Sequence, residues 1–319
     1  MPLLSVQNLK SYYILGDEVV KAVDDVSFEM EKGEIVTFVG ESGSGKSTLG
    51  LSIIRLLPYP GKIIDGKIIF KGRDLLELSE KEMSKIRGKE ISSVFQDPLT
   101  SLDPLMRVGD QIVETITTHF DITKEEAKSQ ARKYLELVGI PAERYYDYPH
   151  QFSGGMRQRA MIAMAIATQP SLIIADEPTT ALDVIVQAQI MQLFRRLRDE
   201  LGVSIILITH DISLAMEVSD KIGVMYAGHL VEYGSTIKIY EDPLHPYTKG
   251  LLEAVPNIEA EVTEFKYIPG NPPDLTSPPS GCRFHPRCRY ATEKCKRQEP
   301  KIVVRNGRLV KCHLYGDEA

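Results

Sequence analysis

The sequence predicts an α/β protein whose core is a parallel β-sheet covered by helices. Short apolar runs rich in Ile and Val alternate with amphipathic helical patterns, which is typical of strands joined by crossover helices. A glycine-rich loop also follows the first buried strand and precedes a helix, an arrangement suited to binding an anion. With 319 residues, the chain is long enough for one large domain and a smaller one.

The predicted strands are short, apolar and bounded by polar or turn-forming residues. In chain order they are Glu34–Val39, Lys67–Phe70, Ile91–Phe95, Leu172–Ala175, Ser204–Thr209 and Ile222–Met225. A helix over Ser47–Leu57 follows the glycine-rich loop.

Two further helices are marked by their end signals. The helix Glu125–Val138 is announced by Thr123 with Glu126 three residues later, a capping box, and Gly139 follows as its stop. A second helix ends at Gly202 and directs four apolar side chains inward: Ile190, Phe194, Leu197 and Leu201.

The domain organisation follows from changes in composition. Residues from about 97 to 167 are predicted to form an inserted helical lobe. Prolines gather between Pro256 and Ser280, which predicts an extended linker to a small cysteine-bearing tail. We therefore expect a main domain over residues 1–255 and a linker with a C-terminal extension over residues 256–319.

Charge and hydropathy limit the classes of function. The net charge of −6 does not favour indiscriminate binding to nucleic acid. No run of about 18 apolar residues occurs, and the first ten residues do not resemble a secretory signal. We expect a cytoplasmic protein whose contact with a membrane goes through a partner.

Residues 40–47 fit the phosphate-binding pattern G-x-x-x-x-G-K-[ST] at every fixed position. The loop and its next residue are Gly40, Glu41, Ser42, Gly43, Ser44, Gly45, Lys46, Ser47 and Thr48. Glycines let successive N–H groups curl around an anion. Lys46 can reach the β- and γ-phosphates of a nucleotide, and the Ser47 hydroxyl can ligate Mg²⁺. The loop predicts binding of a nucleoside triphosphate.

Two more segments carry candidate chemistry. The strand before Asp176 and Glu177 ends in these two carboxylates; Asp176 can hold Mg²⁺, and Glu177 can orient and deprotonate an attacking water. Ser153 can cap a helix that begins with Gly154 and Gly155, which leave backbone N–H groups open to a second anion.

These segments together resemble an ABC-type ATPase subunit over residues 3–234. The resemblance rests on six elements in the family's order: the phosphate loop, Gln96, the turn Ser153–Gly155, Asp176 with Glu177, the loop Ala181–Asp183, and His210. It implies a P-loop NTPase fold with a RecA-like core, an N-terminal antiparallel β-subdomain, an inserted helical subdomain and a small Cys-rich C-terminal extension. Phe152 and Met156 differ from the commonest form of the turn.

The resemblance also implies how the elements act. Two such domains pack head to tail, so that Ser153, Gly154 and Gly155 serve the ATP of the opposing chain and Asp183 lies in the dimer contact. His210 is the γ-phosphate contact, and Gln96 senses Mg²⁺ and the attacking water. Tyr13 matches the position that stacks on adenine, although the adjacent Tyr12 is an alternative.

All four cysteines lie within 31 positions of the tail. They are Cys282, Cys288, Cys295 and Cys312. In a cytosolic protein this confinement favours a metal or cluster over disulfides. Without a C-x-x-C pair, zinc and a [4Fe-4S] cluster both stay open. The tail is also basic, with ten Lys and Arg against four Asp and Glu from Gly281 onward.

The tail resembles the C-terminal extension of ATPases of oligopeptide and dipeptide importers. The resemblance rests on three segments in the family's order: Glu241–Thr248, Pro269–Pro273 and Gly281–Cys288. It implies an Mg²⁺-dependent ATPase with an iron–sulfur cluster, peripheral at the cytoplasmic face of the membrane. The implied partners are a second ATPase subunit of another sequence or the same one, two permease subunits and an external peptide-binding protein.

Other functions are weighed against this interpretation. A non-transport ABC ATPase of translation or DNA repair generally has two fused nucleotide domains or a long coiled coil, and this chain has neither. A small-molecule kinase needs no Ser-Gly-Gly turn. Cargo other than peptides, such as a nickel chelate or an oligosaccharide, stays open.

Overall fold

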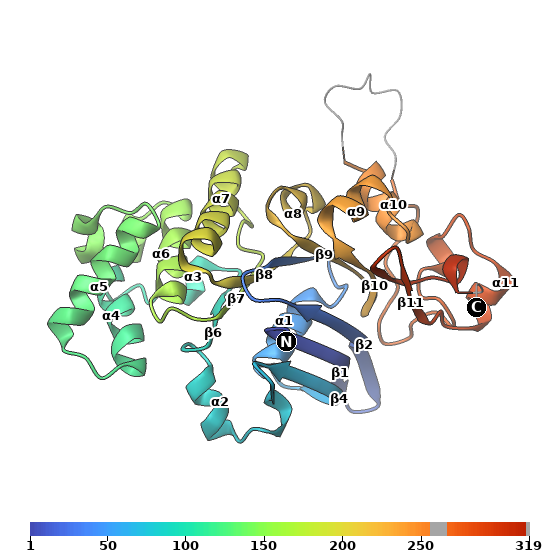
Figure 1. Ribbon diagram of the computed structural model, residues 1–319, viewed down its shortest axis with the longest axis horizontal. Coiled ribbons are helices and arrows are strands. Elements are labelled where there is room, and N and C mark those ends of the chain that lie inside the picture. The colour runs from blue at the N-terminus through green and yellow to red at the C-terminus, as the bar shows by residue number, and fades with distance from the viewer. Residues whose placement is uncertain (256–266, 317–319) are drawn as a thin grey trace. The chain divides into compact units, whose positions relative to one another are not determined.

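The computed structural model describes residues 1–255 and 267–316, which form two compact units (Figure 1). The first unit comprises Met1–Glu31, Val36–Leu76 and Thr209–Ala319 outside those gaps, and the second comprises Lys32–Ile35 and Glu77–Ile208. The first part of the predicted proline-rich linker, residues 256–266, lies outside the described residues.

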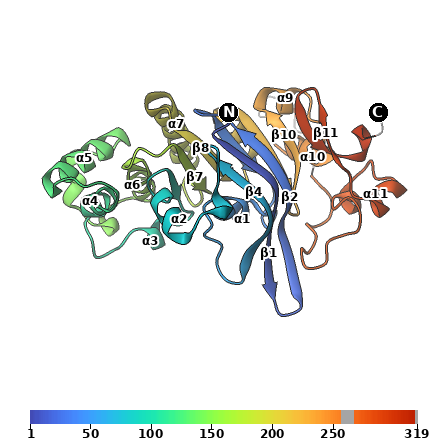
Figure 2. The same cartoon turned by 60° about the horizontal axis from the view of Figure 1, so that its bottom comes forward.

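The N-terminal part of the first unit is an antiparallel sheet with strand order β2-β1-β4-β5 (Figure 2). Its strands are β1 (Leu4–Leu15), β2 (Glu18–Met30), β4 (Gly61–Phe70) and β5 (Arg73–Asp74). Leu4 pairs with Met30 on one side and with Phe70 on the other. All three side chains are buried, so the register places apolar residues of three strands on one face. This sheet matches the predicted antiparallel β-subdomain.

The first unit also holds a mixed sheet in which β3 pairs with β9 in parallel and the remaining pairs are antiparallel, in the order β11-β12-β10-β9-β3. Its strands are β3 (Ile35–Val39), β9 (Lys221–Tyr226), β10 (His229–Ser235), β11 (Ile302–Arg305) and β12 (Arg308–Lys311). The hairpin of β11 and β12 comes from the tail and extends this sheet, because Glu232 of β10 pairs with Val310. These two tail strands are not among the strands predicted from the sequence.

The helices of the first unit include the one that follows the phosphate loop. They are α1 (Lys46–Ile53), α8 (Ile212–Val218), α9 (Thr236–Glu241), α10 (Pro246–Glu253) and α11 (Glu293–Arg297), with short 3₁₀ turns η1 (Leu75–Glu77), η4 (His285–Arg287) and η5 (His313–Tyr315). The helix α1 ends at Ile53, before the predicted Leu57. Arg55 just beyond it has a positive φ of 55°, a conformation that does not continue a right-handed helix.

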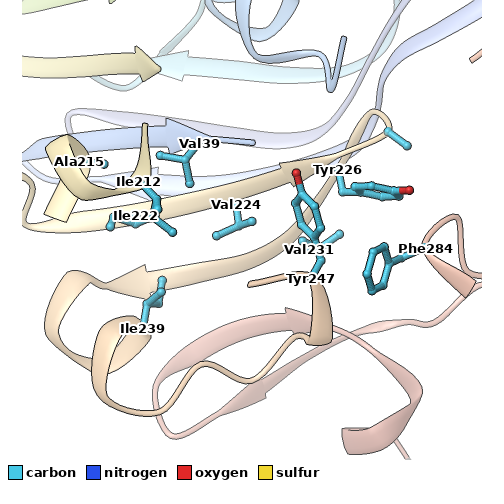
Figure 3. Close-up of a cluster of buried hydrophobic side chains, with 11 residues drawn as sticks. Val39, Ile212, Ala215, Ile222, Val224, Tyr226, Val231, Ile239, Tyr247 and Phe284 are labelled. Atoms are coloured by element: carbon cyan, nitrogen blue, oxygen red, sulfur yellow. The ribbon is translucent and has the colours of Figure 1, made fainter. Parts of the chain in front are cut away.

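One hydrophobic cluster joins distant segments of the first unit (Figure 3). Val39 of β3 and Val224 of β9 pack there with Ile212 of α8. Tyr247 of α10 and Phe284 of the tail complete the cluster, and both are buried. The tail therefore shares a core with the body of the unit, as expected for a segment too small to bury a core of its own.

The second unit contains three parallel strands in the order β8-β7-β6. They are β6 (Ile91–Val94), β7 (Leu172–Asp176) and β8 (Ser204–Thr209), close to the predicted ranges. The helices are α2 (Glu80–Ile86), α3 (Pro98–Ser101), α4 (Val108–His119), α5 (Lys124–Leu137), α6 (Gly154–Ile166) and α7 (Val184–Leu201), with 3₁₀ turns η2 (Ala142–Tyr146) and η3 (Pro149–Gln151). Helices α4 and α5 pack side by side.

The helix ends of the second unit largely match the predictions. The capping box of α5 is present in both directions between Thr123 and Glu126, and Gly202 ends α7 in the left-handed conformation. Ile190 of α7 is buried as predicted, but Leu201 is 43% exposed. Its predicted inward position is wrong because the last turn of α7 extends past the core.

No helix within residues 1–255 or 267–316 has the length and hydropathy needed to cross a bilayer.

Candidate nucleotide-binding site

The phosphate loop connects β3 to α1, and two of its glycines cannot be replaced by a residue with a side chain. Gly45 has φ 100°, and a Cβ there would lie 1.9 Å from the carbonyl oxygen of Ala22. Gly40 has φ 152°, and its Cβ would lie 2.1 Å from the oxygen of Met225. Both contacts are with backbone atoms, which cannot rotate away as a side chain can. Only glycine therefore allows the loop to follow this path.

The side chain of Lys46 is folded along this loop. Its Nζ donates hydrogen bonds to the carbonyl oxygens of Gly40, at 2.8 Å, and of Glu41, at 3.0 Å. The residue is only 6% exposed. A buried ammonium group at the start of α1 adds its charge to the positive end of the helix dipole. The loop is therefore electropositive at the place where a phosphate is expected.

The two candidate tyrosines of β1 have different surroundings. Tyr12 donates a 2.6 Å hydrogen bond to Oδ1 of Asp24, and burial together with this bond raises the pKa of its hydroxyl. The hydroxyl of Tyr13 instead lies 3.4 Å from the hydroxyl of Thr48, beside the phosphate loop. A Cβ on Gly61 would come within 2.9 Å of the Tyr13 ring. Tyr13 therefore directs its hydroxyl toward the residue that follows the phosphate loop, whereas Tyr12 directs its hydroxyl toward Asp24.

The residues present fit ATP with Mg²⁺. Gly40 and Gly45 let the loop pack closely against the carbonyl oxygens of Met225 and Ala22, and Gly45 is the N-cap of α1. The N–H groups at the start of this helix favour an anion. Lys46 supplies a fixed cation. Ser47, in the first turn of α1, supplies a hydroxyl of the kind that ligates Mg²⁺ in this type of loop.

The two carboxylates of the second unit lie where β7 ends. Asp176 is the last residue of the strand. Glu177 follows with φ 48°, a left-handed conformation that is uncommon for a residue with a side chain. Its N–H donates to the oxygen of Ile208, at 2.8 Å, and its Oε2 accepts from Thr180 Oγ1, at 3.2 Å. These bonds fix the backbone of Glu177 and hold its carboxylate.

The Ser-Gly-Gly turn begins α6, as predicted. Oγ of Ser153 accepts a hydrogen bond from the N–H of Met156, at 3.3 Å, and caps the helix. A Cβ on Gly155 would come within 2.7 Å of the side chain of Val186, and one on Gly154 within 3.3 Å of Leu182. The turn thus lies against the beginning of α7, where Asp183 is the N-cap and accepts from the Val186 N–H at 2.9 Å.

The other two candidates are at the ends of strands. Gln96 is exposed, two residues after β6 ends in the second unit. His210 is exposed and directly follows Thr209, the last residue of β8. The predicted site residues are thus divided between the units, with Tyr13, the phosphate loop and His210 in the first and the others in the second.

The predicted iron–sulfur cluster, and with it zinc, is wrong for the cysteines of the tail. Within the described residues, no group of three or more His, Cys, Asp or Glu side chains is arranged to hold a metal ion. Cys282 and Cys288 pack against the hydrophobic cluster of Figure 3, whereas Cys312 packs with Leu244 and Val310 in another.

Burial raises the pKa of the Cys282 thiol to about 11 and that of Cys312 to about 12, and neighbouring cysteines of the tail add to both shifts. Cys282, Cys288 and Cys312 therefore lie in apolar surroundings, as their places in or against the two hydrophobic clusters indicate.

Tyr247 and Arg287 are not among the predicted site residues, yet both contact Glu41 of the phosphate loop. The only signal for them is that each lies in a tail segment that the resemblance already singled out. The contact itself spans more than 200 positions of the chain and cannot be inferred from spacing.

Comparison with known proteins identifies the family. The profile of the ABC transporter family matches residues 23–180, and that of the oligopeptide/dipeptide transporter C-terminal region matches residues 231–295. The dipeptide transport ATP-binding protein DppD of Bacillus subtilis (strain 168) is 49% identical, over 99% of this chain and 96% of that protein. The oligopeptide transport ATP-binding protein OppD of the same organism is 52% identical, over 99% of this chain and 90% of that protein.

Solved structures agree with the predicted fold class. The dimeric, post-hydrolysis structure of the ATP-binding cassette MJ0796, bound to ADP and Pi, is 30% identical, has a TM-score of 0.66, and covers 73% of this chain and 98% of that one. The structure of cbiO1 from Clostridium perfringens, part of an ABC transporter complex, has a TM-score of 0.67 at 27% identity, over 76% of this chain and 91% of that one. With both the family and the fold confirmed, the chain belongs to the ABC transporter family of ATPases, among the ATP-binding proteins of oligopeptide and dipeptide transport.

Proposed function

We propose that this protein is the ATP-hydrolysing subunit of an importer that takes up dipeptides or oligopeptides. The observation that carries the proposal is a glycine-shaped phosphate loop with a buried lysine, in a chain that matches the dipeptide and oligopeptide transport ATP-binding proteins along nearly its whole length. The match of residues 231–295 to the C-terminal region of these transporters supports peptides as the cargo.

ATP binds with its phosphates in the loop Gly40–Thr48. The ammonium group of Lys46 faces the β- and γ-phosphates, and backbone N–H groups of the loop and of α1 bind the phosphate oxygens. Mg²⁺ bound with ATP neutralises phosphate charge, and the oxygens of Ser47, Gln96 and Asp176 are its proposed ligands. The position of the Tyr13 hydroxyl beside Thr48 supports Tyr13, rather than Tyr12, as the ring that stacks on adenine.

Glu177 is the proposed general base. Its carboxylate takes a proton from the attacking water, and its fixed backbone supports this role because a base must be held within hydrogen-bond reach of that proton. Strained backbone conformations such as φ 48° occur frequently at active sites. His210 and Gln96, both exposed beyond strand ends, are proposed to contact the γ-phosphate and to orient the water.

A second ATPase chain completes the site. Ser153, Gly154 and Gly155 are proposed to bind the ATP held by the opposing chain, and their proximity to Asp183 supports one continuous contact surface. ATP then joins the two chains, and hydrolysis releases them. The partner is proposed to be a related ATPase of different sequence.

The remaining subunits are proposed from the same relationship. Two permease subunits and an external peptide-binding protein complete the importer, and this chain acts peripherally at the cytoplasmic face of the membrane. The main domain over residues 1–255 binds nucleotide, and residues 256–319 form its extension.

The test is transport of a labelled peptide into vesicles that contain this chain, its ATPase partner and the permeases, with the binding protein outside. Glu177→Gln should keep ATP affinity while slowing hydrolysis by about 10²-fold or more, because the base is removed. Lys46→Ala should weaken ATP binding itself. Unchanged hydrolysis in Glu177→Gln, or ATP hydrolysis without peptide uptake, contradicts the proposal.

A further inference from the structure

An ion pair connects the C-terminal extension to the phosphate loop. Arg287 Nη1 donates to Oε2 of Glu41, at 2.6 Å, and Nη2 donates to Oε1, at 2.9 Å. The pair is bidentate, the strongest geometry that an arginine and a carboxylate adopt. The side chain of Arg287 is 5% exposed and that of Glu41 is 30% exposed, so solvent screens this contact far less than a surface salt bridge.

A second contact reaches the same residue from α10. The N–H of Glu41 donates to the hydroxyl oxygen of Tyr247, at 2.9 Å. Tyr247 is fully buried, and its own N–H donates to Nδ1 of His245, the N-cap of α10. Both the backbone and the side chain of Glu41 are therefore held by residues beyond position 240.

The two contacting residues are themselves fixed by aromatic packing. Tyr226, Tyr247 and Phe284 lie together in Figure 3. Their ring centroids are 4.6 to 5.4 Å apart. The guanidinium of Arg287 lies 5.7 Å from the centre of the Tyr226 ring, and its Nε donates to the oxygen of Pro269 at 2.8 Å. Since Phe284 and Arg287 belong to one turn of the tail, docking this ring also sets the position of the guanidinium.

Glu41 is next to the glycine that opens the loop, and its carbonyl oxygen accepts from Lys46. The loop conformation that presents Lys46 thus depends on where Glu41 lies. We propose that Arg287 and Tyr247 are positioning residues for the phosphate loop, through which the docked C-terminal extension sets the affinity for ATP. The inference rests on the proposed binding of ATP at this loop.

The positioning contacts affect the free protein more than the protein with ATP bound. Loop conformations in which Glu41 has left its partners do not present the phosphate site, and the apparent dissociation constant rises in proportion to their population. Bound ATP restores the loop by its own contacts. Removing a positioning contact should therefore weaken ATP binding more than it slows hydrolysis at saturating ATP.

The experiment compares full-length variants by calorimetric titration with MgATP and by steady-state ATP hydrolysis. Arg287→Met should raise Kd and KM about 5- to 20-fold while kcat changes less than about twofold, following the population argument. Arg287→Lys keeps the positive charge but not the two parallel donors of the guanidinium. It should bind MgATP more tightly than Arg287→Met but less tightly than wild type. Tyr247→Phe keeps the ring and should raise Kd by a smaller factor.

The control is Arg289→Met. Arg289 is also an arginine of the tail, two positions from Arg287, but it is exposed and pairs with Glu253 rather than with the phosphate loop. This variant should leave the docked tail in place and Kd for MgATP unchanged. In a double-mutant cycle, Glu41→Gln with Arg287→Met should weaken binding no more than the stronger single change does.

The outcomes separate the two proposals. If wild-type protein does not bind MgATP, or Lys46→Ala binds it equally well, the proposed function fails. If those two behave as expected but folded Arg287→Met and Tyr247→Phe bind MgATP like wild type, the positioning role is refuted. Equal losses of affinity in Arg289→Met and Arg287→Met, or additive losses in the cycle, also refute it.

Discussion

His245 makes the stability of the first unit depend on pH. The imidazole is buried, and burial lowers its pKa from 6.5 to about 3. Its Nδ1 accepts the hydrogen bond of the Tyr247 N–H, at 3.1 Å, which requires that nitrogen to be unprotonated. The folded chain therefore keeps His245 neutral where the unfolded chain protonates it.

The sign and size of the effect follow from this difference. Between pH 6.5 and 3 the unfolded state binds the extra proton, so the free energy of unfolding falls as the pH falls. The slope from this one group approaches about 1.4 kcal/mol per pH unit. Moving from pH 7 to pH 5 should thus cost about 2 kcal/mol of stability through His245 alone.

The assay is chemical unfolding of wild type and His245→Asn between pH 4 and 8. The side-chain oxygen of Asn can accept the hydrogen bond that Nδ1 accepts from the Tyr247 N–H, and Asn is a good N-cap. The cap of α10 is therefore kept while the titrating group is removed. The variant should be less stable at pH 7, because ring contacts with Phe284 are lost, but its profile should be flatter. The exposed His150, changed to Asn, controls for removing a histidine. Parallel profiles for wild type and His245→Asn would refute the argument.

Two further predictions concern packing and the loop. Phe284→Ala should cost about 3–5 kcal/mol of unfolding free energy, as expected for a buried ring, and should make the tail accessible to limited proteolysis; a loss below 1 kcal/mol would mean that the aromatic cluster does not dock the tail. Gly45→Ala should abolish measurable MgATP binding, because its Cβ meets the Ala22 oxygen. Gly43→Ala, where a Cβ meets no described atom within 4 Å, should weaken binding less, and equal losses would argue against the steric account.

The elements that the sequence predicted well are those specified by local signals. The capping box of Thr123 and Glu126 and the stop at Gly202 are decided within a few residues, and both were predicted. The phosphate loop was predicted equally well, because its glycines are required by the backbone conformation of the loop itself. By contrast, the end of α1 was missed because the apolar run to Leu57 continues past the turn at Arg55.

The cysteines show where a local pattern misleads. Four thiols within 31 positions suggest a shared ligand, but the described residues hold no metal-binding group, and three of the cysteines pack with Leu244 and Val310 or against the cluster of Figure 3. Which neighbours a tail residue meets is decided by the pairing of β12 with β10 and by the docking of Phe284. Neither can be read from cysteine spacing.

The contact between the tail and the phosphate loop is likewise not visible in the sequence. Glu41 occupies a variable position of the loop pattern, and Arg287 lies 246 positions later. In the sequence, neither residue can be distinguished from an ordinary charged residue of the surface. Only the fold brings them into a bidentate pair, and it does so because the aromatic side chains of β9, α10 and the tail pack on one another. The extension therefore depends on the core of the nucleotide-binding unit for its own stability, and the phosphate loop depends on the extension for the position of Glu41.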